Sequence, residues 1–354
     1  MKRCLCLLLV LCLSLPLTAC DGLVPLEEEG ELQKFSEYSF DYFDTATTIT
    51  GYEKSQEDFD RVAEEILRQL KEYHQLYNIY LRYNGVDNLC TVNELTDGAH
   101  PVVKADPKIL DLLEFARQMY DETGGLTNVA MGSVLKLWHD RRSVGMDNPA
   151  KASLPSMEAL REAAKHTAID KMVIDRAAGT VTLTDPQMRL DVGAIAKGYA
   201  VEQIARWLEQ EGKEGYILNV GGNVRTIGHK PDGTKWQVGI ENPEDTSADY
   251  LAILELSGQA LVTSGSYQRY YIVDGKRYHH IIHPDTLMPA EGLLSVSVVC
   301  ADSGRGDALS TALFCLSVEE GKALVESLPG VEAHWVAADG TRTTSSGWSK
   351  YLKQ

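Results

Sequence analysis

Cysteine is scarce in this sequence beyond the first twenty residues. Only Cys90, Cys300 and Cys315 follow Cys20, and no pair has the Cys-x-x-Cys spacing. Disulfide frameworks and thiolate zinc sites both depend on closely spaced cysteine pairs, so the sequence supports neither. Cys300 and Cys315 lie in apolar stretches, where we expect them to be small core residues.

The apolar run near the N-terminus, residues 5–17, is short for a helix that crosses a bilayer. It follows Lys2 and Arg3 and ends in Leu-Thr-Ala-Cys, with the cysteine at position 20. This pattern is typical of a lipoprotein signal peptide, which is cut before a cysteine that then carries lipid. We therefore predict a lipoprotein signal peptide over residues 1–19 and lipidation of Cys20. The alternative is an ordinary secretory signal with a chance cysteine at the cleavage site.

Basic residues are few relative to acidic ones. The chain has 34 Lys and Arg against 51 Asp and Glu, and cleavage would remove Lys2 and Arg3, leaving 32 basic residues and a formal charge of -19. Such a surface repels the phosphates of nucleic acid, which we do not expect as a partner. Membrane binding would come from the lipid on Cys20 and not from a basic patch. We expect an extracytoplasmic protein, lipid-anchored to the cell membrane.

The mature chain is long enough for one large domain. Residues 20–37 are expected to form a flexible tether from the lipid to a catalytic domain over residues 38–354. Hydrophobic periodicity and caps predict helices after Ser55 and Asp106, and over 157–165, 197–210, 304–316 and 318–327. Strands are predicted over 38–52, 172–174, 180–183, 216–220, 236–240, 251–256, 270–273, 278–283 and 294–299, with a terminal hairpin over 332–344. The predicted class is α+β, with mixed or antiparallel sheets and packed helices.

Two segments place small residues beside predicted helices. In residues 124–132, followed by Leu137-Trp138-His139, small residues would let the backbone approach a flat or charged ligand, although a plain loop gives the same pattern. In residues 190–199, Asp191 and Lys197 lie at a helix N-terminus. There, amides and the ammonium group can bind phosphate, and the carboxylate can accept hydrogen bonds from a flavin ring, a base or a ribose. A capping Asp and a solvated Lys are the alternative.

A third segment, residues 218–223, has Gly221-Gly222 at the end of an apolar strand, which indicates a bulge or a close backbone approach. The segment is not Gly-x-Gly-x-x-Gly and no βαβ unit follows, which argues against a nicotinamide-dependent dehydrogenase.

The fourth segment is a C-terminal cluster of polar residues. It contains residues 263–267, three histidines at 279, 280 and 283, and then Asp307 and Thr311. Asp307 and Thr311 are four apart and share one helix face, where a carboxylate and a hydroxyl suit a hard cation such as Mg²⁺. Capping and a solvated helix surface are the alternative. The histidines suggest zinc, but on a strand His280 would point away from His279 and His283, so one three-histidine site is hard to build.

Together these segments resemble the ApbE family, the FAD:protein FMN transferases. The resemblance runs from about Tyr38 to Leu316 and rests on LDVGAIAKGYA, LNVGGN, VTSGSYQRYY with HHIIHP, and DALSTALF, in family order. It implies a single ApbE-like catalytic domain, related to the T-fold. It also implies Mg²⁺-dependent transfer of FMN from FAD to a Thr or Ser hydroxyl of a target protein, with release of AMP. The implied acceptor is an electron-transfer subunit or a secreted flavoprotein.

The resemblance also implies roles for individual residues. Asp307, Thr311 and the backbone carbonyl of Ala194 match the family's Mg²⁺ ligands. The positions that match FAD contacts are Asp44, Tyr80, Asn128, Ala130, Met131, Asp191, Lys197, His280 and Ile281. His280 matches the histidine of the His-Ile-Ile/Leu-Asp-Pro motif and is the candidate general base, which we expect to titrate near the ordinary value of about 6.5.

Three positions depart from the family pattern. Phe43-Asp44-Thr45 stands where Met-Gly-Thr is common, His283 replaces Asp before Pro284, and Asn128 stands where many members have Asp. These changes concern flavin contacts and a second metal, and leave Asp307 and Thr311 untouched. Two other functions remain open. One is an Mg²⁺-dependent FAD pyrophosphatase, in which water replaces the protein hydroxyl, and the other is a non-catalytic lipoprotein that only binds FAD.

Overall fold

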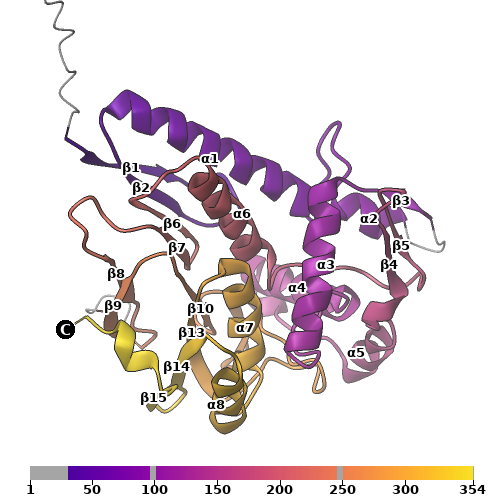
Figure 1. Cartoon of the computed structure of the whole chain (residues 1–354). Helices are drawn as coiled ribbons and strands as arrows, with labels where there is room; N and C mark the ends of the chain where they lie inside the picture. The colour runs from indigo at the N-terminus through magenta and orange to yellow at the C-terminus, as the bar shows by residue number, and fades with distance from the viewer. Residues whose placement is uncertain (1–30, 96–100, 245–249, 354) are drawn as a thin grey trace, which may run out of the picture. The chain divides into compact units, whose positions relative to one another are not determined.

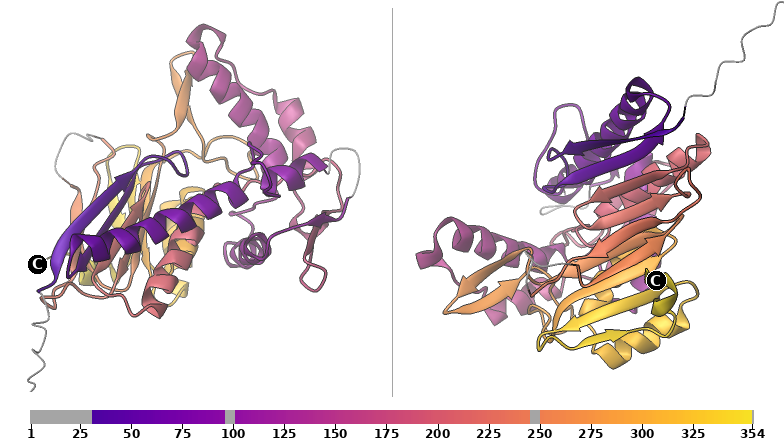
Figure 2. Two further views of the ribbon diagram at one scale, coloured as in Figure 1. Left: turned by 90° about the horizontal axis from the view of Figure 1, so that it is seen from above. Right: turned by 90° about the vertical axis from the view of Figure 1, so that its left-hand side faces the viewer.

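An antiparallel sheet of eight strands forms the centre of the fold (Figure 1). The computed structural model describes residues 31–95, 101–244 and 250–353, so the predicted signal peptide and Cys20 lie outside the described residues. The strands lie in the order β1 (Gln33–Ser39), β2 (Thr47–Glu53), β6 (Tyr216–Val220), β7 (Asn223–Ile227), β10 (Ala260–Gly265), β13 (Leu293–Cys300), β14 (Glu332–Ala337) and β15 (Arg342–Thr344). The right view of Figure 2 shows this order, from indigo β1 to yellow β15.

The central strands are buried on both faces, so layers must cover the sheet on each side. Helices α6 (Ala196–Gln210) and α7 (Ser303–Phe314) pack on β7, β10 and β13. Alternate residues of β13 then face different cores: Val298 packs with α7, whereas Val299 packs with the hairpin of β8 (Trp236–Ile240) and β9 (Ala252–Leu256). This burial explains why β7 and β13 lack a regular alternation of polar and apolar residues.

The longer helices follow their sequence signals closely. Helix α1 (Gln56–Tyr77) is capped by Ser55, whose side chain accepts a hydrogen bond from the N–H of Asp58. The helix buries Phe59, Ile66 and Leu70. Helix α3 (Pro107–Glu122) is capped by Asp106, and α8 (Val318–Ser327) begins with a complete capping box. These caps satisfy amides that have no partner within the helix, so the predicted starting points are confirmed.

The remaining elements pack beside this core. They are α2 (Leu89–Leu95), α4 (Gly132–Asp147), α5 (Met157–Ala164), β3 (Val103–Lys104), β4 (Met172–Asp175), β5 (Thr180–Leu183), β11 (Tyr270–Val273), β12 (Lys276–His279) and 3₁₀ turns over 149–151, 169–171 and 348–351. The strands predicted over 172–174, 180–183 and 270–273 are confirmed, and they form the hairpins β4–β5 and β11–β12. The left view of Figure 2 shows α4 beside the orange β11–β12 hairpin. Elements α2, α4, β3, β7 and β10 were not predicted. The α+β class is confirmed, and all the strand pairs described are antiparallel.

Three boundaries predicted from the sequence are wrong. The strand expected over 38–52 is a hairpin, because the chain turns back between β1 and β2 at Phe43 and Asp44, whose φ angles are 56° and 51°. Strand β1 already begins at Gln33, so residues 33–37 pair with β2 instead of belonging to the tether.

The strand expected over 278–283 is also shorter than predicted. Strand β12 ends at His279, after which the chain bends.

We expect Ile66→Ala to lower the free energy of unfolding by about 2–5 kcal/mol. Ile66 is fully buried on the inner face of α1, so its truncation leaves a cavity. Urea denaturation measures the loss. The matched control on the same helix is exposed Glu64→Ala, which should change stability by no more than about 0.5 kcal/mol. Equal effects of the two substitutions would show that α1 does not bury the face described.

Candidate active site

A cavity of about 760 Å³ brings most of the predicted site residues together. Its volume lies within the range of cofactor and ligand pockets. Its wall includes the following predicted residues: Asp44, Tyr80, Asn128, Met131, Asp191, Ala194, Lys197, His280, Ile281, Asp307 and Thr311. Ala130 is the exception, because it is fully buried and its N–H donates to Asn128 Oδ1 at 2.9 Å. The four separate motifs therefore converge on one space.

The Asp307 carboxylate is held by the first turn of α6. Asp307 is only 5% exposed, yet its Oδ2 accepts from the Gly198 N–H at 2.8 Å and its Oδ1 lies 3.9 Å from Lys197 Nζ. Early helix amides have no partner within the helix and carry partial positive charge, so they stabilise an anion. Burial raises the pKa of Asp307, and the Lys197 cation and the Gly198 N–H partly offset that rise.

Thr311 lies one turn after Asp307, and both side chains contribute to the cavity wall. The Thr311 hydroxyl donates to the backbone carbonyl of Asp307 at 3.3 Å, which leaves its oxygen lone pairs able to accept or to coordinate. The predicted common face of the two residues is confirmed.

Gly198 allows the close approach of α6 and α7 on which this contact depends. A Cβ added at Gly198 would lie 2.3 Å from the Ser303 carbonyl oxygen and 2.5 Å from Asp307 Cβ. Both distances are far below van der Waals contact, so a larger residue would push the helices apart. The glycine of the segment 190–199 is thus required for packing, and the site depends on it.

Asn223, which follows the Gly221-Gly222 turn, is a site residue that sequence reasoning did not single out. It lines the cavity, is 2% exposed, and forms a side-chain hydrogen bond to Asp307. Its Oδ1 has no hydrogen-bond partner among the described residues. An unpaired buried amide oxygen costs about 1–3 kcal/mol, so a group supplied from outside the chain would satisfy it. The signal for it was the motif LNVGGN, which ends at this residue.

The described oxygen donors fit a hard divalent cation better than zinc. The wall of the cavity includes the Asp307 carboxylate, the Thr311 hydroxyl and the Asn223 amide, and Mg²⁺ prefers oxygen ligands. No group of three His, Cys, Asp or Glu side chains suited to a metal occurs among the described residues. His279 Nε2 lies 2.7 Å from the Ala290 carbonyl in the core, whereas His280 lines the cavity. The two neighbours thus face apart, as predicted.

His280 carries a defined tautomer. Its Nδ1 lies 3.2 Å from the Arg269 carbonyl oxygen, which can only accept, so Nδ1 bears the proton and Nε2 keeps a lone pair. Burial lowers the pKa of His280 to about 3, and the cations of Arg269 and Arg142 lower it further in the same direction. This pKa lies below the expected ordinary value near 6.5, because the half-buried ring in the cavity wall faces cations.

Tyr80, His139 and Arg142 form another wall of the cavity. The rings of Tyr80 and His139 stack with centroids 4.4 Å apart, and Arg142 Nη2 lies 3.3 Å from His139 Nδ1. Tyr80 is 53% exposed, so one side of its ring is accessible to a ligand. Sequence reasoning included His139 in a motif without a role and missed Arg142, because α4 was not predicted.

The turn that carries Asp44 has a strained backbone and is stabilised by a hydrogen bond to His74. Phe43 and Asp44 both have positive φ angles, a conformation that costs non-glycine residues about 1–3 kcal/mol each. The Phe43 N–H donates to His74 Nδ1 at 3.0 Å, and His74 Nε2 lies 2.9 Å from the Tyr83 hydroxyl. The half-buried His74 thus supports the backbone at the segment where this chain departs from the family pattern.

Asn128 and Asp191 are both occupied by contacts within the protein. Asn128 Nδ2 donates to the Thr167 carbonyl at 2.9 Å, so its amide orders the loop before α4. Asp191 Oδ1 accepts from the Gly193 N–H, and Asn93 on α2 holds the adjacent Leu190 peptide through both its N–H and its carbonyl. Burial raises the pKa of Asp191. This acid can still accept hydrogen bonds with its second oxygen.

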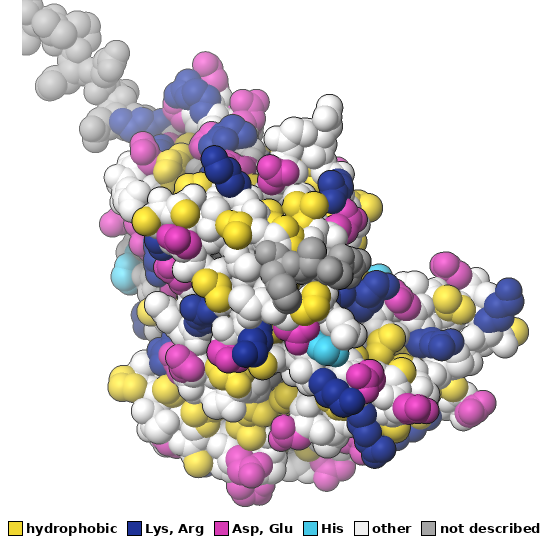
Figure 3. All heavy atoms as spheres, turned by 90° about the vertical axis from the view of Figure 1, so that its right-hand side faces the viewer, with side chains coloured by type: hydrophobic (Ala, Val, Ile, Leu, Met, Phe, Trp, Pro, Cys, Tyr) yellow, Lys and Arg dark blue, Asp and Glu magenta, His cyan; other side chains and the backbone are white. Residues whose placement is uncertain are grey.

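The surface gives no competing charged site on the face that Figure 3 displays. Acidic, basic and apolar side chains are interspersed there over the described residues. The cavity is therefore large enough for a sizeable ligand, and oxygen donors, cations and aromatic side chains all contribute to its wall.

Comparison with known proteins identifies the class. A family model described as the ApbE family matches residues 43–335. An FAD:protein FMN transferase of Treponema pallidum is 33% identical over 306 residues, covering 81% of this chain and 82% of that protein. One from Klebsiella pneumoniae is 31% identical and covers 78% and 82%. The crystal structure of the ApbE protein of Thermotoga maritima superposes with a TM-score of 0.79 at 29% identity, covering 91% of this chain and all of that one.

The chain belongs to the ApbE family. The fold expected from the resemblance is therefore confirmed, and the antiparallel sheet with packed helices is the one that this family shares.

We expect Gly198→Ala to impair the site more than its single methyl group suggests, because the added carbon meets the Ser303 carbonyl and Asp307 directly. The free energy of unfolding should fall by about 1–3 kcal/mol. Urea denaturation measures the loss. Gly212→Ala, at a positive φ in open space, is a control for strain alone. Unchanged stability of Gly198→Ala would refute the close approach.

Proposed function

We propose that the protein is an Mg²⁺-dependent FAD:protein FMN transferase that attaches FMN to a Thr or Ser hydroxyl of an acceptor protein and releases AMP. Transfer of FMN from FAD to protein is the activity for which its relatives are named. The observation that supports the proposal most strongly is the shared cavity. It contains Asp307, Thr311 and Lys197 together with an unprotonated His280 nitrogen.

Asp307, Thr311 and the backbone carbonyl of Ala194 would hold Mg²⁺. The unpaired buried oxygen of Asn223 and the carboxylate of Asp307 fit such an ion, because both are hard oxygen donors. When bound, the ion neutralises negative charge on the diphosphate of FAD. Lys197, Arg142 and Arg269, which share the cavity, would add fixed positive charge around the same group.

His280 would act on the acceptor. Its Nε2 takes the proton of the acceptor hydroxyl as the oxygen attacks the phosphorus of the FMN half. The bond from that phosphorus to the AMP oxygen breaks, and AMP leaves with the electron pair. Because Nδ1–H donates to the fixed Arg269 carbonyl, the ring is oriented with Nε2 as the base. The exposed Tyr80 ring and Asp191 would bind the flavin portion.

The acceptor and the location of the protein are part of the proposal. The acceptor would be an electron-transfer subunit or a secreted flavoprotein with a Thr or Ser flavinylation motif. Lipidated Cys20 would anchor the enzyme outside the cytoplasm at the cell membrane. No helix within the described part of the chain is long and apolar enough to cross a membrane.

One gel experiment tests the activity. The protein is incubated with FAD, Mg²⁺ and a candidate acceptor, and a fluorescent flavin band on the denatured acceptor supports the transferase. Free FMN and AMP without a band would instead show a pyrophosphatase, and unchanged FAD would show a protein that only binds it. An acceptor lacking its Thr or Ser hydroxyl is the matched control.

We expect Asp307→Asn to reduce transfer at least about 100-fold at fixed Mg²⁺, because the isosteric amide removes the charge that would hold the ion. Chelation of Mg²⁺ should abolish transfer by the unmodified protein. Rates of band formation measure both effects. Exposed Asp121→Asn is the control and should leave the rate unchanged. Full activity of Asp307→Asn would remove the metal assignment.

We expect His280→Ala to slow transfer about 10²–10⁴-fold while FAD affinity stays within a few-fold, since a positioned base contributes that much. Because its pKa is lowered to about 3, His280 is neutral throughout neutral pH in the free protein, with Nε2 unprotonated. Acid should therefore block His280 as a base only when the ring is protonated, near pH 3. The kcat/KM of the unmodified protein should therefore show no His280-dependent fall between about pH 7.5 and 5.5.

Neighbouring His283→Ala is the control for this prediction, because His283 lies outside the cavity wall and should keep its activity. An acidic limb near pH 6.5 that disappears in His280→Ala would contradict the low pKa. Loss of FAD binding in that variant would make His280 a binding residue.

A further inference from the structure

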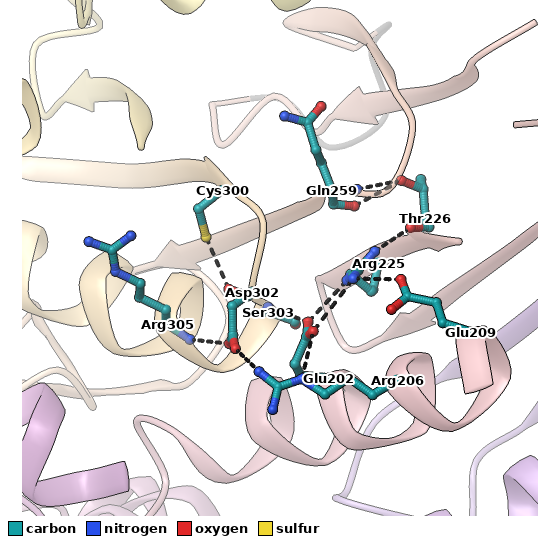
Figure 4. Close-up of polar contacts among 10 residues, drawn as sticks. All are labelled: Glu202, Arg206, Glu209, Arg225, Thr226, Gln259, Cys300, Asp302, Ser303 and Arg305. Atoms are coloured by element: carbon teal, nitrogen blue, oxygen red, sulfur yellow. Dashed lines mark hydrogen bonds and ion pairs between the residues drawn. The ribbon is translucent and has the colours of Figure 1, made fainter. Parts of the chain in front are cut away.

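A buried ion pair lies close to the candidate active site but does not line the cavity. Glu202 on α6 and Arg225 on β7 are 3% and 4% exposed, and Arg225 Nε lies 3.0 Å from Glu202 Oε2. Neither residue lines the cavity. Figure 4 shows the pair at the centre of a network that joins α6, β7 and the start of α7.

Glu202 connects three elements through its carboxylate. Besides Arg225, its Oε2 accepts from the Ser303 N–H of α7 at 2.9 Å, and its Oε1 lies 3.3 Å from Arg206 Nε. Arg206 also pairs with Asp302 at 2.7 Å, and Asp302 caps α7. The first turn of α7 is therefore fixed to α6 by charged contacts at two successive residues, as Figure 4 shows.

Glu202, Ser303 and Arg225 each lie one structural repeat from a residue of the site. Glu202 follows Gly198 by four residues on α6, and Ser303 precedes Asp307 by four on α7. Residues four apart share one helix face.

On β7 the repeat is two residues. Arg225 follows Asn223 by two on that strand, and residues two apart on a strand share one face of the sheet. The contacts of Glu202 with Arg225 and Ser303 thus form a second layer, parallel to the contacts of Asp307 with Asn223 and Gly198.

An ion pair in this place is not needed for stability alone. Desolvation of two charges offsets most of their attraction, and apolar replacements of similar volume are often as stable. What apolar side chains cannot do is accept the Ser303 N–H and fix the register of α7 against α6. A register shift on α7 would move Asp307 and Thr311 together, away from Lys197 and Ala194.

We infer that Glu202 and Arg225 are positioning residues for the metal site, which hold the helix that carries Asp307 and Thr311 in register with α6. This inference rests on the proposed function, because it assumes that Asp307 and Thr311 bind a divalent ion. Outer contacts of this kind typically change metal affinity about 10–100-fold.

The experiment compares Glu202→Gln and the double variant Glu202→Leu with Arg225→Met. The double variant removes both buried charges at similar volume, which avoids a single unpaired buried charge; it leaves Glu209, the second partner of Arg225, half-exposed to water. Circular dichroism establishes that each variant is folded before metal binding is compared. Binding of Mn²⁺ alone is measured from the EPR signal of the free ion, and the Mg²⁺ half-saturation of transfer is measured in parallel. We expect both constants to rise about 10–100-fold in folded protein, with excess Mg²⁺ restoring part of the rate.

Glu53→Gln is the matched control. Glu53 is also a buried acid in an ion pair, with Lys213 at 2.6 Å, but it lies at the far end of β2 and outside the cavity wall. It should lower the melting temperature without changing metal binding. If the Glu202 variants also lose only stability, and bind Mn²⁺ as the unmodified protein does, the positioning role is refuted. Absence of Mn²⁺ binding and of Mg²⁺ dependence in the unmodified protein would instead refute the proposed function itself.

Discussion

The site depends on one buried carboxylate, Asp307, being stable at the N-terminus of α6. A carboxylate that is 5% exposed is unfavourable unless other groups replace its lost water. Its partners are the Gly198 N–H, the Lys197 ammonium group and the Asn223 amide, which come from a helix and from a separate strand. The acid therefore has a stable place only when α6, α7 and β7 are packed together, and the site cannot form before the central fold does.

That packing constraint explains the glycines and the ion pair around the site. Gly198 brings the helices close enough for its N–H to reach Asp307, and Gly221-Gly222 turns the chain so that Asn223 enters the same space. A closely approached pair of helices can still slide, because small residues provide few contacts that define register. The contacts of the Glu202 carboxylate with Ser303 and Arg225, one helical turn away, fix the register of α7 against α6.

The sequence predicted the parts of this molecule whose signals are local. Caps such as Ser55 and Asp106, and the spacing of Asp307 and Thr311, depend only on neighbours along the chain. The missed elements lack such signals: β7 is buried at every position, so it does not alternate, and α4 begins in a glycine-rich segment without a side-chain cap. The motif LNVGGN ends at Asn223, but nothing local shows that its side chain reaches Asp307. Likewise no local pattern distinguishes Arg142 or the low pKa of His280, because their roles follow from residues that are distant in sequence.

The ligand-free site has two opposite electrostatic imbalances. Burial raises the pKa of Asp307 at one point of the cavity, which a divalent cation would relieve. At another point of the cavity, burial and the nearby Arg269 and Arg142 lower the pKa of His280. The negative charge of a diphosphate would offset this effect of the cations. A protein that bound only the metal or only the anion would correct one imbalance and leave the other. Under the proposed function, a cation and a diphosphate bound together would relieve both imbalances, and the proton affinity of His280 would rise on binding.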